Sequence, residues 1–214
     1  MSNFAHMSVF FAKEINMDEL ETVQMLLRAI GSSPVNNLES THPDVANARA
    51  CIDRVRKSVQ KRGWWFNQDY NTVFQADAGG VVNIPKEITK FVSDKVQYVK
   101  RGRKVYDAHE QTFVLNTDVC AIKTVRSLDW EDMPASIQEY AGYLACAQFV
   151  SDEIEDPNKQ QKFEQLAGLA KLDVDAEDLD SARVNVFNNN RIARARGGVL
   201  PYSAGNNLRP NSYS

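Results

Sequence analysis

The hydrophobic pattern of this chain changes its period twice, and that change limits the folds open to it. Apolar residues recur at helical spacing over 14–30 and again over 43–62. From 64 to 130 the chain is rich in aromatic and β-branched residues and is broken by short turns, which predicts several short strands. Helical spacing then returns at Met133. The pattern predicts an α+β protein, in which a bundle of about four helices carries an inserted antiparallel β-domain.

Capping residues and helix breakers indicate where the first helices begin and end. Gly31 follows the last apolar position of the first helix and is expected to end it. Thr41 or His42 opens the second helix, because Pro43 suits a first helical turn. Gly63 stands where a left-handed residue at the C-terminus of that helix is expected.

The C-terminal part divides into a helical segment and a tail. A last helix is expected from about 158 to 188, with Leu179 among its inward positions and a possible break at 171–178. From 189 on there is no hydrophobic periodicity, which predicts an extended tail. The segment from 183 to the end contains five arginines and no acidic residue. The predicted domains are an N-terminal arm (1–13), a discontinuous helical bundle (14–62 plus 134–189), a β-domain insertion (63–133) and an extended C-terminal tail (190–214).

An aromatic run, Trp64, Trp65 and Phe66, follows directly on the second helix. If the run is a strand, Trp64 and Phe66 share one face and Trp65 takes the other, which favours packing of the sheet against the helices. A platform for stacking bases needs exposed aromatics interleaved with basic residues, and here the basic residues lie on the preceding helix. Gly63, Trp64 and Phe66 are therefore predicted to form the junction between bundle and sheet.

Motifs for catalysis or metal binding are absent from the sequence. The three histidines, His6, His42 and His109, share no spacing typical of metal ligands. No P-loop, G-x-G-x-x-G or G-x-S-x-G motif occurs. We therefore predict no catalytic residue, no metal and no cofactor.

The cysteines and the apolar runs bear on where the chain is made. Cys51, Cys120 and Cys146 are far apart, odd in number and flanked by apolar residues, which predicts small core residues rather than disulfides. Free thiols fit synthesis in a reducing cytoplasm. The start of the sequence lacks the basic region of a signal peptide, and no apolar run approaches the length of a membrane span.

Neighbouring acids leave an enzymatic alternative open. Asp129 precedes Glu131 and Asp132, and Asp152 precedes Glu153. A glycosidase needs two carboxyl groups across a cleft, so a polysaccharide hydrolase is one alternative function. With 28 acids in the chain, such pairs also arise by chance, and the first cluster suits a helix N-terminus.

Charge is spread unevenly along a chain whose net charge is only −3. Residues 150–180 hold ten acids against three lysines, whereas basic residues gather at 54–62 and 95–104. Either basic patch suits phosphate or an acidic protein surface, so duplex-DNA binding by the helix at 45–62 is a second alternative. Opposed charged flanks also suit head-to-tail association into a ring. The candidate ring contacts are Arg54, Arg56, Lys57, Lys61, Arg62, Asp173, Asp175, Glu177 and Asp178.

Several segments taken together resemble a known family. The most specific is "RAIGSSPVNNLE", followed by "PDVANAR" and "RGWWFN", and "LDWEDMP" comes next. In this order they resemble the tail tubular protein A family, the head-to-tail adaptors of short-tailed bacteriophages. The resemblance covers about 14–190 and rests on scaffold positions, since none of these segments is a catalytic motif.

The resemblance implies a structural role in the virion tail, after synthesis in the host cytoplasm. It implies a ring of twelve copies that joins the portal protein to the tail nozzle, built from tail tubular protein B, with tail fibres docked nearby and DNA passing through the lumen without specific binding. It implies no enzyme activity and no membrane contact of the free protein. By position and composition, the tail corresponds to an extension that grips the portal, with Arg191, Arg194, Arg196, Leu200, Tyr202, Leu208 and Arg209 as the candidate contacts.

Overall fold

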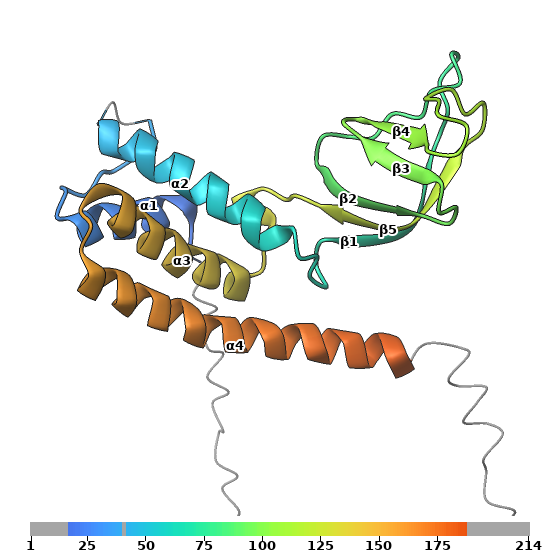
Figure 1. Cartoon of the computed structure of the whole chain (residues 1–214). Coiled ribbons are helices and arrows are strands. Elements are labelled where there is room, and N and C mark those ends of the chain that lie inside the picture. The colour runs from blue at the N-terminus through green and yellow to red at the C-terminus, as the bar shows by residue number, and fades with distance from the viewer. Residues whose placement is uncertain (1–16, 40–41, 188–214) are drawn as a thin grey trace, which may run out of the picture. The chain divides into compact units, whose positions relative to one another are not determined.

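A computed structural model describes residues 17–39 and 42–187 of the chain (Figure 1). The chain divides into two compact units, residues 1–175 and 176–214. The first unit holds three helices, most of a fourth and all the strands. Four helices with small antiparallel sheets confirm the predicted α+β class.

The first two helices begin and end on the residues that their sequence favours. In α1 (Glu19–Ile30), the Asp18 carboxylate accepts a hydrogen bond from the Glu21 N–H, and Gly31 ends the helix at φ 81°. In α2 (Pro43–Gln60), the His42 side chain caps the N-terminus immediately before the proline, so the second of the two predicted starts is confirmed. These caps satisfy backbone groups that have no partner within the helix.

The other helices follow the sheet in sequence. A single 3-10 turn, η1 (Trp130–Asp132), precedes α3 (Ala135–Glu153) and then α4 (Pro157–Phe187). The possible break at 171–178 is wrong, because α4 continues through it. No glycine or proline occurs in that part of the helix, and Lys171 donates to Asp175 one turn later. The prediction that Leu179 faces inward is also wrong, because this side chain is 61% exposed.

Residues from α1, α2, α3 and α4 share one hydrophobic core. Leu26, Val55, Ile137 and Phe149 are at most 2% exposed within it, and Val174 adds a contact from α4. Two aromatic residues outside the four helices, Trp64 and Trp130, are buried in the same core. Burying each such side chain contributes about 1.5–3 kcal/mol, so this core accounts for much of the stability of the helical part.

The strands form two small antiparallel sheets. The larger has the order β1 (Gln68–Phe74), β5 (Val119–Arg126), β2 (Ile88–Ser93), with Val73 opposite Cys120. The smaller is the hairpin of β3 (Tyr98–Arg101) and β4 (Lys104–Asp107), which turns at Gly102 with φ 60°. The two sheets share a hydrophobic cluster that is separate from the helical core. It consists of Phe74, Val82, Ile84, Ile88, Tyr98, Val105, Val119 and Ala121. The boundaries of the β-domain at 63 and 133 stay a prediction.

The aromatic run is a turn and not a strand, which corrects the prediction from the sequence. β1 begins only at Gln68, after the chain has turned at Trp65 and Phe66. Alternation between two faces therefore does not apply to these residues. Gly63 is also not the helix cap itself: α2 ends at Gln60, and the Gly63 N–H returns to the Gln60 carbonyl at 3.0 Å.

Crossing a bilayer requires a helix of about 20 mostly apolar residues. None of the helices in the described part of the chain is both long enough and apolar enough to do so.

Candidate interaction surfaces

The junction between α2 and the sheet is organised around one buried asparagine. Asn67 is 2% exposed, and its side-chain oxygen accepts from the Trp64 N–H at 2.8 Å. Its amide nitrogen donates to the Gln60 carbonyl at 3.1 Å and to the Arg126 carbonyl at 2.8 Å. One side chain thus joins the end of α2, the aromatic turn and the end of β5.

A buried glutamine makes a second link at the same place. Gln60 is fully buried, accepts from the Leu128 N–H at 2.7 Å and donates to the Leu128 carbonyl at 3.0 Å. This pair of bonds imitates a strand pairing between the end of α2 and the segment that leaves β5. Buried amide side chains are stable only when their donors and acceptors are matched, as they are here.

The three predicted junction residues differ in what they contribute. Gly63 has φ 80°, and a Cβ there would lie 2.8 Å from a methyl of Val125. Trp64 is buried and donates its indole N–H to the Val59 carbonyl at 2.9 Å. Phe66 is half-buried and stacks edge-on with Trp65, whose ring centroid is 5.5 Å away. The sequence missed Gln60 and Asn67, although an asparagine directly after an aromatic run is a recognisable turn former.

Most cations of α2 are already held by carboxylates of the same chain. Arg54 pairs with Asp152 at 2.8 Å, and Lys57 pairs with Asp53. In the turn after α2, Arg62 pairs with Asp175 at 3.1 Å. Exposed pairs of this kind are worth up to about 1 kcal/mol each, yet binding DNA would have to compete with every one of them. The arrangement therefore disfavours α2 as a surface for duplex DNA.

Arg56 is the most enclosed of these cations. Its side chain is 13% exposed, and the guanidinium bonds to Asp53 and Asp129, both at 2.7 Å, and to the Leu128 carbonyl. Burial on its own lowers the pKa of Arg56, but the hydrogen bonds that the guanidinium donates to the two carboxylates raise it overall. Arg56 thus fixes α2 to the segment before η1, and it offers little to an outside partner.

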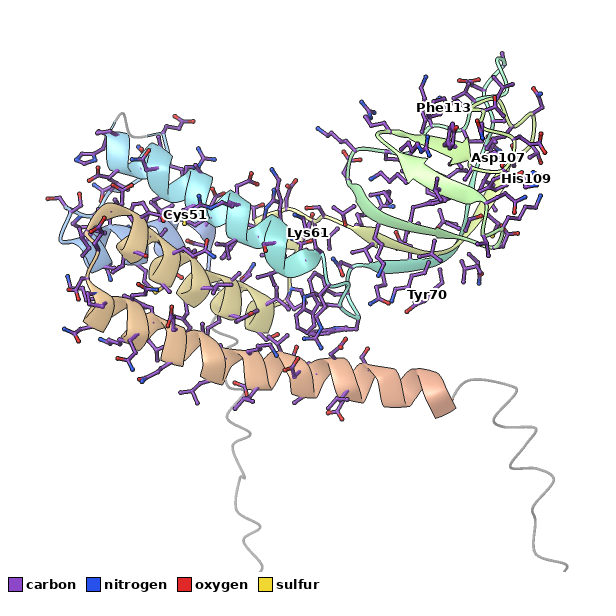
Figure 2. All side chains as sticks on the ribbon, viewed as in Figure 1. Cys51, Lys61, Tyr70, Asp107, His109 and Phe113 are labelled. Atoms are coloured by element: carbon purple, nitrogen blue, oxygen red, sulfur yellow. The ribbon has the colours of Figure 1, made fainter. Side chains whose placement is uncertain are left out.

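The remaining ring-contact candidates lie near the ends of α2 and along α4. Lys61 is exposed just after α2 (Figure 2), and Asp173 is exposed on α4. Asp175 receives a hydrogen bond from Lys171, and this bond, with Arg62 nearby, lowers the pKa of its carboxyl. Glu177 and Asp178 lie further along the same helix, in the second unit.

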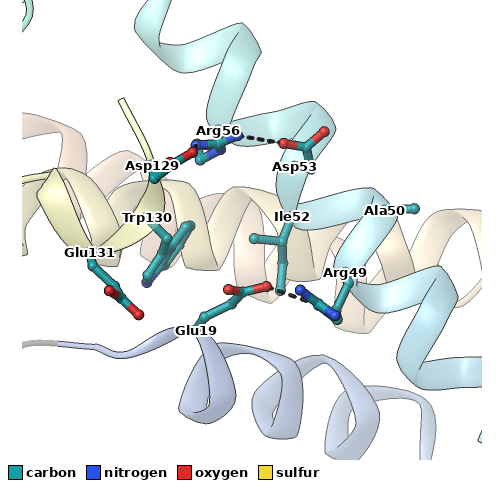
Figure 3. Close-up of a pocket in the computed structure, with 9 residues that line it drawn as sticks. All are labelled: Glu19, Arg49, Ala50, Ile52, Asp53, Arg56, Asp129, Trp130 and Glu131. Carbon is teal, nitrogen blue, oxygen red and sulfur yellow. Dashed lines mark hydrogen bonds and ion pairs between the residues drawn. The ribbon is translucent and has the colours of Figure 1, made fainter. Parts of the chain in front are cut away.

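A groove of about 540 Å³ lies beside α1, α2 and η1 (Figure 3). Three of its four acids are bound by arginines: Arg49 pairs with Glu19 at 3.1 Å, and Arg56 holds Asp53 and Asp129. Although partial burial raises it, the pKa of Asp53 lies below its usual value because Lys57 and Arg56 donate to the carboxylate. The full lining is Glu19, Arg49, Ala50, Ile52, Asp53, Arg56, Asp129, Trp130 and Glu131.

This groove does not favour the hydrolase alternative. A general acid needs a carboxyl that keeps its proton near neutral pH, so its pKa must be raised. The shift at Asp53 has the opposite sign. The nearby carboxylates of Glu19 and Asp129 are turned toward arginines (Figure 3).

Other reactive side chains are buried or dispersed. Cys51 and Cys146 lie in the helical core, where desolvation raises the pKa of both thiols, and Cys120 is half-buried on β5. All three are free thiols, as the sequence predicts. Within the described residues, no cluster of three or more His, Cys, Asp or Glu side chains is arranged to hold a metal ion.

The candidate portal contacts fall outside the described residues. This applies to Arg191, Arg194, Arg196, Leu200, Tyr202, Leu208 and Arg209.

Two linked cores, ion-paired surfaces and a groove in which arginines hold three of the four acids are features of a structural protein. A family model described as tail tubular protein matches residues 20–195. The chain therefore belongs to the tail tubular protein family, which confirms the resemblance seen in the sequence, and it is a structural component of the phage virion tail. It is similar to tail tubular protein A of Klebsiella phage KP34, with 26% identity over 185 residues that cover 84% of this chain and 98% of the relative.

Proposed function

We propose that this chain is the head-to-tail adaptor of a short-tailed phage, forming a ring that joins the portal to the tail nozzle and encloses a conduit for DNA ejection. The observation that carries the proposal is the family match over residues 20–195, which takes in the helices, the sheets and the start of the tail. Nearly the whole length of the phage relative aligns with this chain, so the similarity extends over the entire relative and is not confined to a single domain.

The proposed partners follow from that position in the virion. Neighbouring copies form a ring of twelve, the portal protein binds on one side, and the nozzle of tail tubular protein B binds on the other, with tail fibres near that junction. DNA passes through the lumen without sequence-specific binding. The chain acts without catalysis and without a cofactor, since positioning of partners is all that the role requires.

Ring contacts between copies are proposed to use the charged helices α2 and α4. Lys61 and Asp173 suit this role best, because both are exposed at opposite-sign surfaces. Arg54 is also accessible, since its pair with Asp152 is an exposed one that a neighbouring copy can replace at small cost. Arg56 suits it least, because its partners already surround it.

The tail is proposed to bind the portal. Its arginines suit paired hydrogen bonds to carboxylates, and Leu200, Tyr202 and Leu208 add apolar contacts. Ordering a segment on binding costs entropy, so the contacts have to be numerous.

Deleting 191–214 tests this role of the tail. The truncated chain is expected to keep its circular dichroism spectrum and melting transition and to lose co-sedimentation with the purified portal. The variant R191Q/R194Q/R196Q keeps the full length and is expected to bind the portal more weakly than the wild type. A truncated chain that unfolds, or that still binds the portal at full strength, contradicts the assignment.

A further inference from the structure

We propose that the tip of the β3–β4 hairpin, residues 101–104, binds the phosphate backbone of duplex DNA. Arg101, Arg103 and Lys104 are exposed around the Gly102 turn. No acid occurs between Lys95 and Tyr106 in the sequence, so the tip is purely basic, and the acid of the hairpin, Asp107, is buried at the far end of β4. The proposal rests on the adaptor function for its biological meaning, since an adaptor encloses the path of the DNA.

These cations differ from those of α2 in that no carboxylate holds them in a close ion pair, although the pKa of the Asp77 carboxyl, which backbone hydrogen bonds lower most, is lowered further by the nearby Lys104. None of the ion pairs within 17–39 and 42–187 involves Arg101, Arg103 or Lys104. A phosphate that approaches the tip therefore displaces only water and counterions, and the release of counterions is the main source of non-specific affinity for DNA. The positive charge available to a polyanion thus lies on the hairpin.

Aromatic stacking holds one of the arginines in place. The Arg101 guanidinium lies over the Tyr106 ring, 3.7 Å from its centroid. The Tyr106 ring in turn meets Phe113 edge-on at 4.8 Å between centroids, and Figure 2 shows Phe113 beside this hairpin. A guanidinium already ordered against a ring loses less entropy when it binds, and the Arg101 side chain remains exposed.

The base of the hairpin is attached firmly to the rest of the β-domain. Lys100 donates to the Ile88 carbonyl, and desolvation there lowers the pKa of its ammonium group. The Ile84 N–H donates to the Arg103 carbonyl at 2.8 Å. Lys100 therefore anchors the hairpin to β2 and is not counted among the DNA contacts. The tip is presented on a rigid support.

The chemistry of the tip favours DNA over a protein partner. Residues 101–104 include no apolar side chain, whereas protein interfaces are organised around buried apolar or aromatic anchors. A two-stranded β-ribbon also fits the width of the DNA major groove, where its cations lie near phosphates of both strands. Such contacts fix position without reading sequence, which suits a surface that DNA slides past.

The test is a titration of a fluorescent 20-base-pair duplex with purified full-length protein at NaCl concentrations from 50 to 200 mM. The variant R101Q/R103Q/K104Q removes the tip charges. R28Q/R49Q/K162Q is the matched control, because it removes two arginines and one lysine that are exposed on the helices. Each phosphate contact contributes about 0.9 to the slope of log affinity against log salt, so the tip variant is expected to lose about 2.7 of that slope. Over this salt range the wild type then loses about 40-fold more affinity than the tip variant, and the control keeps the wild-type slope.

Several results would overturn the inference: no binding by the wild type at 50 mM NaCl, an unchanged slope in the tip variant, or equal losses in both variants. Circular dichroism checks folding, and R101K/R103K, which retains the charge, is expected to retain the slope.

A tip variant that binds DNA normally but no longer sediments as a ring would mean that the tip contacts protein. Ring formation without these DNA slopes refutes this inference alone, and the slopes without any ring refute the adaptor function alone.

Discussion

Replacing Asn67 by alanine removes three hydrogen bonds from a buried position at the junction of helix and sheet. The Trp64 N–H and the carbonyls of Gln60 and Arg126 then lose their partner at distances of 2.8–3.1 Å. Each lost bond costs about 1 kcal/mol net, so the substitution is expected to lower the free energy of unfolding by about 3 kcal/mol. For a chain of this size that corresponds to a fall of about 6–12 °C in melting temperature.

Urea unfolding followed by tryptophan fluorescence measures this loss, because Trp64 is buried in the affected turn. Asn83→Ala is the matched control: this asparagine is exposed and donates only to Asp77, so a change within about 0.5 kcal/mol is expected. Asn67→Asp is expected to be at least as damaging as alanine, since a carboxylate would face two carbonyl oxygens. An N67A protein that unfolds within about 0.5 kcal/mol of the wild type would refute the central role given to this side chain.

Three further predictions concern stability and thiol access. Gly63→Ala is expected to lower the free energy of unfolding in urea by about 2–3 kcal/mol, because its Cβ would meet Val125 at a residue with positive φ. At Gly102 a Cβ has open space, so Gly102→Ala is expected to cost only about 1 kcal/mol. Equal losses in the two variants would contradict this explanation. Cys120 alone is expected to react with a thiol reagent in the native protein and the other two cysteines only in urea, so fast labelling of all three would disprove their burial. The depressed pKa of Asp53 contributes stability above its unfolded pKa of about 3.9 that is lost as the pH falls through its lower folded value. D53N is therefore expected to be less stable than the wild type by up to about 1 kcal/mol at pH 7, and the gap is expected to close as the pH falls through the folded pKa of Asp53. A gap that stays constant with pH would exclude this cause.

Local signals predicted the parts of the fold that depend on neighbours in sequence. The His42 and Pro43 start and the Gly31 end each depend on residues within a few positions. The aromatic turn was missed because its conformation depends on the Asn67 bond to Arg126, which lies 59 residues away. Such a bond leaves no periodicity in the sequence.

The charged surfaces show the same limit. The sequence locates basic residues on α2 and at 95–104, but it does not tell which of them are paired. Arg54 on α2 meets Asp152 on α3, and Arg62 in the turn after α2 meets Asp175 on α4, only because folding brings these segments together. Arg101 has no such partner among the described residues, since no acid lies near it in sequence and the fold brings none into an ion pair. The ion pairs that form within the folded chain therefore decide which basic side chains are available to bind another molecule.

The most direct test of the adaptor account is the mass of the purified protein, alone and mixed with its portal, by sedimentation velocity and negative-stain imaging. The account predicts a closed ring of about twelve copies, formed by the protein itself or on the portal, with a central opening. A monomer that sediments unchanged in the presence of the portal would contradict it.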